Sequence, residues 1–188
     1  MSMTGLNNIE KRAAFSLATV FGLRMLGLFM ILPIFAIYGK ELSGYSPIWL
    51  GLAIGAYGLT QALLQIPMGI LSDKYGRKPI ILIGLVIFCL GSVVAAMSDT
   101  IYGVVIGRCI QGMGAIASAV LALAADLSRE DQRPKVMATI GMFIGVSFTV
   151  AMVVGPIVAE AFGLSGLFWF TAVLTILAMV MIQFMVPN

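Results

Sequence analysis

One stretch of this sequence decides the fold: Gly69-Ile70-Leu71-Ser72-Asp73-Lys74-Tyr75-Gly76-Arg77-Lys78-Pro79. Charge, glycine and proline crowd together here between two long apolar runs, which is typical of a tight, water-facing turn between two membrane helices. Gly76 gives the loop conformational freedom, and Pro79 fits the first turn of the next helix, where its missing N–H costs nothing. Asp73 falls at the end of the preceding helix, where the macrodipole disfavours an anion. This aspartate therefore needs a cation or the N-terminus of another helix beside it.

The composition predicts an integral membrane protein. Of 188 residues, 61% are hydrophobic and only 10% are charged, and the mean hydropathy is +1.08. The net charge of +3 comes from cations in short loops, so no nucleic-acid partner is expected. The chain has no histidine, the commonest metal ligand and general base, and we expect no metal site and no cofactor. The polar N-terminus and the long first apolar run argue against a cleavable signal peptide.

A membrane-spanning helix needs about 20 mostly apolar residues, and six runs reach that length. Every connection between them is short, so neighbouring helices should form antiparallel hairpins. If the N-terminus is cytoplasmic, all the loop cations except Lys40 lie on the cytoplasmic side, as the positive-inside rule requires. Both termini are therefore expected in the cytoplasm. The six predicted helices cover 13–38, 48–71, 79–97, 101–125, 136–159 and 164–186 of a single 1–188 bundle.

The pattern G-x-L-x-D-x-x-G-R-K resembles the signature loop between helices 2 and 3 of the major facilitator superfamily of secondary transporters. An ordinary positive-inside loop would explain the cations, but not two glycines and an aspartate at fixed spacing. The resemblance implies an all-α membrane fold in which six helices form two inverted three-helix repeats, half of a twelve-helix architecture. It also implies four partners: the lipid bilayer, a carboxy-terminal six-helix half, a small-molecule substrate and protons. The residues that carry the pattern are Gly69, Leu71, Asp73, Gly76, Arg77 and Lys78.

A second motif lies in the predicted helix 101–125. The run Gly107-Arg108-Cys109-Ile110-Gln111-Gly112-Met113-Gly114-Ala115 is similar to the R-x-x-Q-G-x-G-A pattern of the family, which is often discussed as part of proton coupling. Arg108 and Gln111 are one turn apart and share a helix face. Gly112 and Gly114 permit close helix packing. The alternative is an arginine that snorkels to the outer interface.

A third motif is partial. Ala151-Met152-Val153-Val154-Gly155-Pro156 resembles the G-x-x-x-G-P motif of drug/proton antiporters in the superfamily, but alanine replaces the first glycine. Ala159 and Glu160 stand where a Gly-Gly pair is common, and these departures weaken the antiporter assignment. Pro156 predicts a kink in this helix. The alternative to an antiporter motif is that the stretch is a simple proline kink with no role in transport. Among superfamily members, the whole pattern is most similar to bacterial inner-membrane transporters of the YajR type.

Three classes of function compete. The resemblance implies a proton-coupled secondary transporter of the efflux or antiport kind in a bacterial inner membrane, with this chain as its amino-terminal half. The alternative is a structural or regulatory six-helix membrane protein that transports nothing. An enzyme is disfavoured, because the sequence has no histidine, no acidic pair in mid-membrane and no G-x-S-x-G motif.

The charged loop residues yield two geometric expectations. We expect Arg77 to pair with Asp126, which ends the predicted helix 101–125, and Asp73 to face a helix N-terminus of the carboxy-terminal half. Opening toward the cytoplasm would break that second contact and make the cluster a conformational latch. We also expect the small residues Gly69 and Gly155 to lie on an uncovered surface that meets the other half.

Two arginines fall inside apolar runs, at Arg24 and Arg108. Arg24 lies about 16 Å into a core about 30 Å thick, where an arginine costs on the order of 2.5–3.5 kcal/mol. All eight acidic residues lie in loops or at helix ends, so none is an obvious partner. We therefore expect both arginines to face the transport cavity. The alternative is that Arg24 bonds backbone carbonyls and glutamines such as Gln61 inside the bundle.

Overall fold

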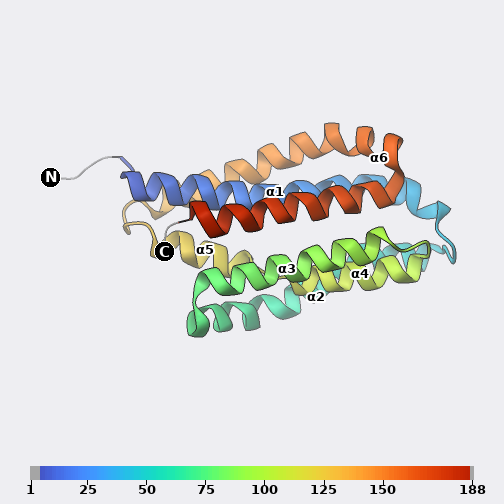
Figure 1. Ribbon diagram of the computed structural model, residues 1–188, viewed down its shortest axis with the longest axis horizontal. Coiled ribbons are helices and arrows are strands. Elements are labelled where there is room, and N and C mark those ends of the chain that lie inside the picture. Colours follow the sequence, from blue (N-terminus) through green and yellow to red (C-terminus); the bar gives the residue numbers. More distant parts are fainter. Residues whose placement is uncertain (1–4, 187–188) are drawn as a thin grey trace.

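Helices account for most of residues 5–186, the part of the chain that this computed structural model describes. Five segments among these residues are long and apolar enough to cross a membrane, as the composition predicts. Figure 1 shows a lengthwise bundle in which the start of α1 and the end of α6 lie at the same end. The helices are α1 (Asn8–Tyr38), the 3₁₀ turn η1 (Gly39–Glu41), α2 (Pro47–Tyr75), α3 (Arg77–Ala96), α4 (Ile101–Met113), α5 (Ala117–Asp126) and α6 (Arg133–Met185).

Local capping chemistry sets several helix starts. The side chain of Asn7 accepts from the Glu10 N–H while Glu10 accepts from the Asn7 N–H, a complete capping box before α1. Ser46 caps α2 by accepting from the backbone of Trp49, and Thr100 caps α4 in the same way. The caps of α2 and α4 end the loops at the end of the bundle opposite the signature turn, whereas the capping box of α1 lies at the same end as that turn (Figure 1).

The predicted helices 136–159 and 164–186 both fall within α6, which reverses direction at Gly163. This glycine has φ 66° and ψ −166° and is the one non-helical residue inside α6. Figure 1 shows the two arms of α6, orange and red, running back along the bundle. Pro156 lies in the first arm and does not interrupt its helical backbone.

The predicted helix 101–125 corresponds to one apolar segment, Ile101–Asp126, that is long enough to cross a membrane, but its helix is interrupted and divides into α4 and α5. The backbone leaves the helix at Gly114, where ψ is 48°, and α5 starts at Ala117. Gly112 and Gly114 each weaken a helix by about 1 kcal/mol relative to alanine. Gly114 also lies so close to α3 that any side chain there would overlap the Gly84 carbonyl oxygen and approach the Phe88 backbone at 3.0 Å. The helix is therefore interrupted at a point where it packs closely on α3.

Two apolar cores fill the bundle along its length. The first surrounds the early part of α1 with α3, α5 and both ends of α6, and the second surrounds the later part of α1 with α2, α4 and the reversal of α6. Between them, glycines permit the closest contacts. For example, Gly27 of α1 lies against Thr171 of α6, which donates a hydrogen bond to its carbonyl at 3.3 Å.

The expected uncovered position of Gly155 is wrong. Gly155 is buried, and a side chain there would lie 3.3 Å from the Met30 carbonyl oxygen of α1. The face of small residues on α6 packs on α1, inside this bundle. Gly69 is half-buried and faces Ser118 of α5 rather than open space. At five other glycines with helical backbone, an added side chain would meet no atom of another segment within 4 Å, namely Gly51, Gly55 and Gly58 of α2 and Gly141 and Gly145 of α6.

Candidate functional site

The signature stretch forms a turn with a single linking residue. Gly76 stands alone between α2 and α3 with φ 96° and ψ 148°, a backbone region that side chains other than glycine rarely adopt. This abrupt reversal places Asp73 in the last turn of α2 and Arg77 in the first turn of α3, and the two side chains form an ion pair. The glycine is needed for its conformation, since the nearest atom to an added side chain is 3.5 Å away, on Pro79.

Arg77 also connects this turn to α5. Its Nε donates to Oδ2 of Asp126 at 3.1 Å, as predicted, and its Nη1 donates to the buried Ser72 hydroxyl at 2.8 Å. We call Ser72, Asp73, Arg77 and Asp126 the charge cluster. Both aspartates lie at the C-terminal ends of helices, where the dipole disfavours them, and the guanidinium offsets that cost.

The two aspartates of the charge cluster are exposed, whereas Ser72 is buried and Arg77 is partly buried. The side chains of Asp73 and Asp126 are 63% and 56% exposed, and that of Arg77 is 23% exposed. Exposed pairs of this kind contribute about 0.2–1 kcal/mol each. The cluster therefore sets the geometry of three helix ends more than it stabilises the fold, and Asp73 keeps a free face.

The sequence analysis missed a second ion pair at the same end of the bundle. The carboxylate of Glu10, only 1% exposed, accepts from the Nε, Nη2 and backbone N–H of Arg129 at 2.9–3.0 Å. The hydrogen bond to this carboxylate raises the pKa of Arg129 above its ordinary value. The pattern Asn7-x-x-Glu10 before an apolar run could have indicated that Glu10 lies in the first turn of a helix, because this pattern marks a capping box.

Two cations hold the end of α6, and neither role was expected. Arg12 donates from Nε to the Met185 carbonyl at 2.8 Å, and Lys78 of the signature stretch donates to the Val186 carbonyl at 2.9 Å. Both positive charges thus lie at the negative end of the α6 dipole, where cations are stabilising. These contacts tie the starts of α1 and α3 to the end of α6.

Arg108 is buried in the middle of the bundle. Its Nη1 donates to Oε1 of Gln111 at 2.9 Å, its Nε donates to the Ala53 carbonyl of α2 at 3.3 Å, and its guanidinium lies 4.7 Å from the Tyr57 ring centroid. Gln111 in turn donates to the Ser92 hydroxyl of α3 at 2.7 Å. With 1% exposure, the arginine does not snorkel to an interface. The motif instead forms a polar network that joins α2, α3 and α4.

Arg24 is completely buried, and its expected cavity-facing position is wrong in this bundle. Its Nη2 donates to the Gly114 carbonyl at 3.0 Å and contacts Oε1 of Gln61 at 3.5 Å, while its guanidinium lies 4.9 Å from the Phe88 ring centroid. The same correction holds for Arg108. Arg24 instead bonds a backbone carbonyl and Gln61 inside the bundle, which was the alternative interpretation. The carbonyl is that of Gly114, which is available because α4 ends there, and the sequence does not reveal this end.

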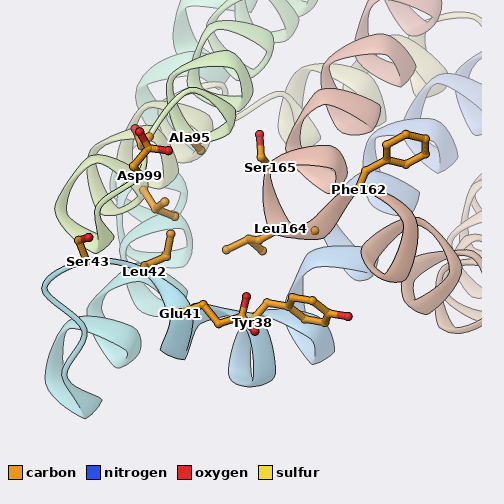
Figure 2. Close-up of a pocket in the computed structure, with 12 residues that line it drawn as sticks. Tyr38, Glu41, Leu42, Ser43, Ala95, Asp99, Phe162, Leu164 and Ser165 are labelled. Atoms are coloured by element: carbon orange, nitrogen blue, oxygen red, sulfur yellow. The ribbon is translucent and has the colours of Figure 1, made fainter.

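The opposite end of the bundle carries a separate cavity of about 400 Å³. Figure 2 shows it among the end of α1, the loop after α3 and the reversal of α6. Its lining includes the carboxylates of Glu41 and Asp99, both exposed, and no basic side chain among the described residues. Across residues 5–186, no group of three histidine, cysteine or acidic side chains could hold a metal ion.

Comparisons with known proteins identify the family. Residues 17–188 match the Major Facilitator Superfamily. The chain is 53% identical over 179 residues to the inner membrane transport protein YajR of Escherichia coli, covering 95% of this chain and 39% of that protein. It is 32% identical over 158 residues to the quinolone resistance protein NorA of Staphylococcus aureus, covering 83% and 40%.

A solved structure shows the same fold. The human organic anion transporter MFSD10 (TETRAN) superposes with a TM-score of 0.82 at 21% identity, covering 96% of this chain and 48% of that one. The chain thus spans less than half the length of all three relatives. The resemblance to YajR-type proteins expected from the sequence is confirmed, and the chain belongs to the major facilitator superfamily.

Proposed function

We propose that this chain is the amino-terminal six-helix bundle of a secondary active transporter, built as two inverted three-helix repeats and working as a proton-coupled antiporter or efflux pump. The charge cluster carries the proposal. It unites the ends of α2, α3 and α5 through Arg77, on a loop whose residues match the family signature. Family membership and the transport names of the relatives support it.

The cluster works as a conformational latch in this proposal. Asp73 is already paired with Arg77, yet its side chain remains 63% exposed. A helix N-terminus from the carboxy-terminal half would stabilise such an aspartate by about 0.3–1 kcal/mol. Opening toward the cytoplasm separates the halves and removes that contact, so the cluster biases the equilibrium between the two states.

The second half would cover the open sides of α2 and of the first arm of α6. The five glycines without neighbours lie on these helices and leave room for another backbone to approach. Large apolar side chains beside them are exposed, among them Leu63 at 66% and Ile66 at 73% on α2 and Val153 at 62% on α6. This surface replaces the one expected around Gly155.

Proton coupling needs a titrating group that this bundle does not contain at its centre. The mid-bundle charges among residues 5–186 are the arginines Arg24 and Arg108, and neither pairs with a carboxylate. In the proposed transporter the proton-carrying carboxylate comes from the other half. The Arg108–Gln111–Ser92 network is the part of this bundle that would respond to its charge.

The proposal is tested with a protein that also contains the second half, reconstituted in liposomes that enclose a pH-sensitive dye. Outward gradients of a panel of small molecules should drive proton movement for at least one of them. Asp73→Asn should slow that movement, whereas Glu130→Gln should not, because the Glu130 side chain is 89% exposed and outside the latch. If no compound moves and no proton moves with a folded protein, the non-transporting alternative is correct.

Orientation and location form a separate part of the proposal. The start of α1, the α2–α3 turn, the loop before α6 and the end of α6 share one end of the bundle, and their cations should face the cytoplasm of a bacterial cell. Single cysteines at positions 40 and 130, in a background without Cys89 and Cys109, test this with a membrane-impermeant reagent. Position 40 should react in intact cells and position 130 only after permeabilisation. The reverse result would invert the topology.

A further inference from the structure

The break between α4 and α5 lies inside the bundle and has an unusual hydrogen-bond arrangement. In a continuous helix, the Gly114 carbonyl would accept from the backbone N–H of Ser118. Here it accepts from Nη2 of Arg24 on α1, at 3.0 Å. The Gly114 N–H tightens to the Gln111 carbonyl at 3.2 Å, and the Ser118 hydroxyl donates to the Gln65 carbonyl of α2 at 3.1 Å. A side chain from another helix has taken the place of a backbone donor.

Arg24 is held at this position by the end of α4. Its Nε and Nη1 are buried and have no hydrogen-bond partner, and buried polar atoms without partners are rare in native proteins. Four contacts compensate: the Gly114 carbonyl, Oε1 of Gln61, the Phe88 ring, and the negative end of the α4 dipole. The helix end, and a Gly114 carbonyl without its usual backbone donor, are present because α4 ends at Met113.

The glycines permit the break without requiring it. Gly112 and Gly114 weaken the helix, but glycine is frequent in membrane helices. The residues that follow, Ala115, Ile116 and Ala117, favour no turn, and no side chain caps the start of α5. In a continuous helix the Gly114 carbonyl would accept from the Ser118 N–H, and Arg24 would have to share that oxygen. Arg108 shares the Ala53 carbonyl in this way inside the unbroken helix α2.

We propose that Arg24 keeps α4 and α5 separate: its guanidinium bonds the Gly114 carbonyl in place of the Ser118 N–H, so the break persists while Arg24 stays, and α4 and α5 join into one helix when Arg24 withdraws. Arg24 is thereby a positioning residue for the α4 motif, because Arg108 and Gln111 lie in the last two turns before the break. This proposal concerns only the break between α4 and α5, so it does not depend on whether the protein is a transporter.

The first test measures the wild-type contact in lipid bilayers by solid-state NMR. With ¹⁵N in the arginine side chains and ¹³C in the Gly114 carbonyl, dipolar recoupling should detect a guanidinium nitrogen at hydrogen-bond range from that carbonyl. Arg12→Met is the matched control, since Arg12 lies on the same helix and, among residues 5–186, its hydrogen bonds go to the end of α6; the coupling should survive this change. If wild-type protein shows no such coupling, the proposal is overturned, and no Arg24 variant is needed to reach that conclusion.

The second test asks whether the break depends on that contact. In Arg24→Met, which keeps length but has no donor, backbone carbon shifts at residues 114–116 should move to helical values. Amide exchange at residues 117–119 should slow by roughly tenfold or more as these groups gain helical partners. Arg24→Lys and Arg24→Gln each keep a donor and should retain the wild-type shifts. Unchanged non-helical shifts in Arg24→Met would show that the glycines alone set the break, and helical shifts in all three variants would show that only the guanidinium can hold it.

Discussion

The substitution Gly112→Ala should destabilise the bundle strongly, because this glycine brings α4 against the backbone of α2. An added methyl would overlap the Thr60 hydroxyl and the Tyr57 carbonyl, and would lie 3.1 Å from the Gln61 nitrogen. Backbone atoms cannot rotate aside, so the two helices must separate by on the order of 1 Å to restore contact distances. Overpacking of this kind costs about 1–3 kcal/mol.

Separation also weakens the hydrogen bond that crosses the same contact. Thr60 donates from Oγ1 to the Cys109 carbonyl at 3.0 Å, and interhelical bonds in membranes contribute about 0.6 kcal/mol on average. Gly141→Ala is the matched control, because nothing lies within 4 Å of that position, and alanine favours a helix by about 1 kcal/mol over glycine. Both variants replace a helix glycine by alanine, so the propensity gain cancels, and they should differ in unfolding free energy by the overpacking cost of about 1–3 kcal/mol plus the weakened hydrogen bond.

The assay is equilibrium unfolding in mixed micelles with increasing dodecyl sulfate, followed by circular dichroism and by the two tryptophans. Gly112→Ala should unfold at a clearly lower fraction of dodecyl sulfate than wild type, and Gly141→Ala at the same or a higher fraction. If both alanine variants unfold together with wild type, close approach of α2 and α4 is not what Gly112 supplies, and the packing argument fails.

Three further predictions concern the end of the bundle with the charge cluster. A double-mutant cycle on Arg77→Gln and Asp126→Asn should give a coupling of about 0.2–1 kcal/mol in the same unfolding assay, and zero coupling would deny the pair any energetic role. Glu10→Gln should lower the thermal midpoint more than Glu130→Gln, because Glu10 is buried against Arg129 and Glu130 is not; equal midpoints would contradict this. Gly76→Ala should cost about 1–3 kcal/mol from its φ of 96° alone, so a neutral result would mean that the turn adopts another conformation.

The signature turn could be predicted from the sequence because its determinants are local. A glycine, a proline and charges at fixed spacing between two apolar runs permit few backbone paths. The pairing of Arg77 with Asp126 followed from electrostatics, since Asp126 was a second anion at an unfavourable helix end. The structure contains that pair at 3.1 Å. Ser72 was missed, although it lies in the same stretch, because a hydroxyl gives no charge signal.

The positions of the buried arginines could not be predicted, because their acceptors are backbone carbonyls. The sequence shows where carboxylates are, and none lies near Arg24 or Arg108. The sequence does not show that α4 ends at Met113 and leaves the carbonyl of Gly114 without a backbone donor. An isolated arginine in an apolar run therefore indicates a polar partner without indicating its type. The error over Gly155 has a related cause, since a row of small residues shows that two helices approach but not which two.

The hydrogen bonds that join different helices distinguish the rigid ends of the bundle from its centre, where movement is easier. At one end, charged hydrogen bonds of Glu10, Arg12, Arg77 and Lys78 connect the starts of α1 and α3 to the loop before α6 and to the ends of α5 and α6. At the other end, backbone bonds between Ser43 and the turn before α4 join the loops after α1 and α3.

The centre also has charged hydrogen bonds, from Arg24 and Arg108, but one helical segment is interrupted there and two nitrogens of the Arg24 guanidinium lack partners. A movement that leaves both ends intact must therefore be absorbed where backbone hydrogen bonds are already open. We expect internal rearrangement of this bundle to concentrate at residues 114–116, with the ends moving as rigid units. Amide exchange across the whole chain tests this: the fastest exchange among buried segments should fall at this break, and faster exchange at the charge cluster would refute the argument.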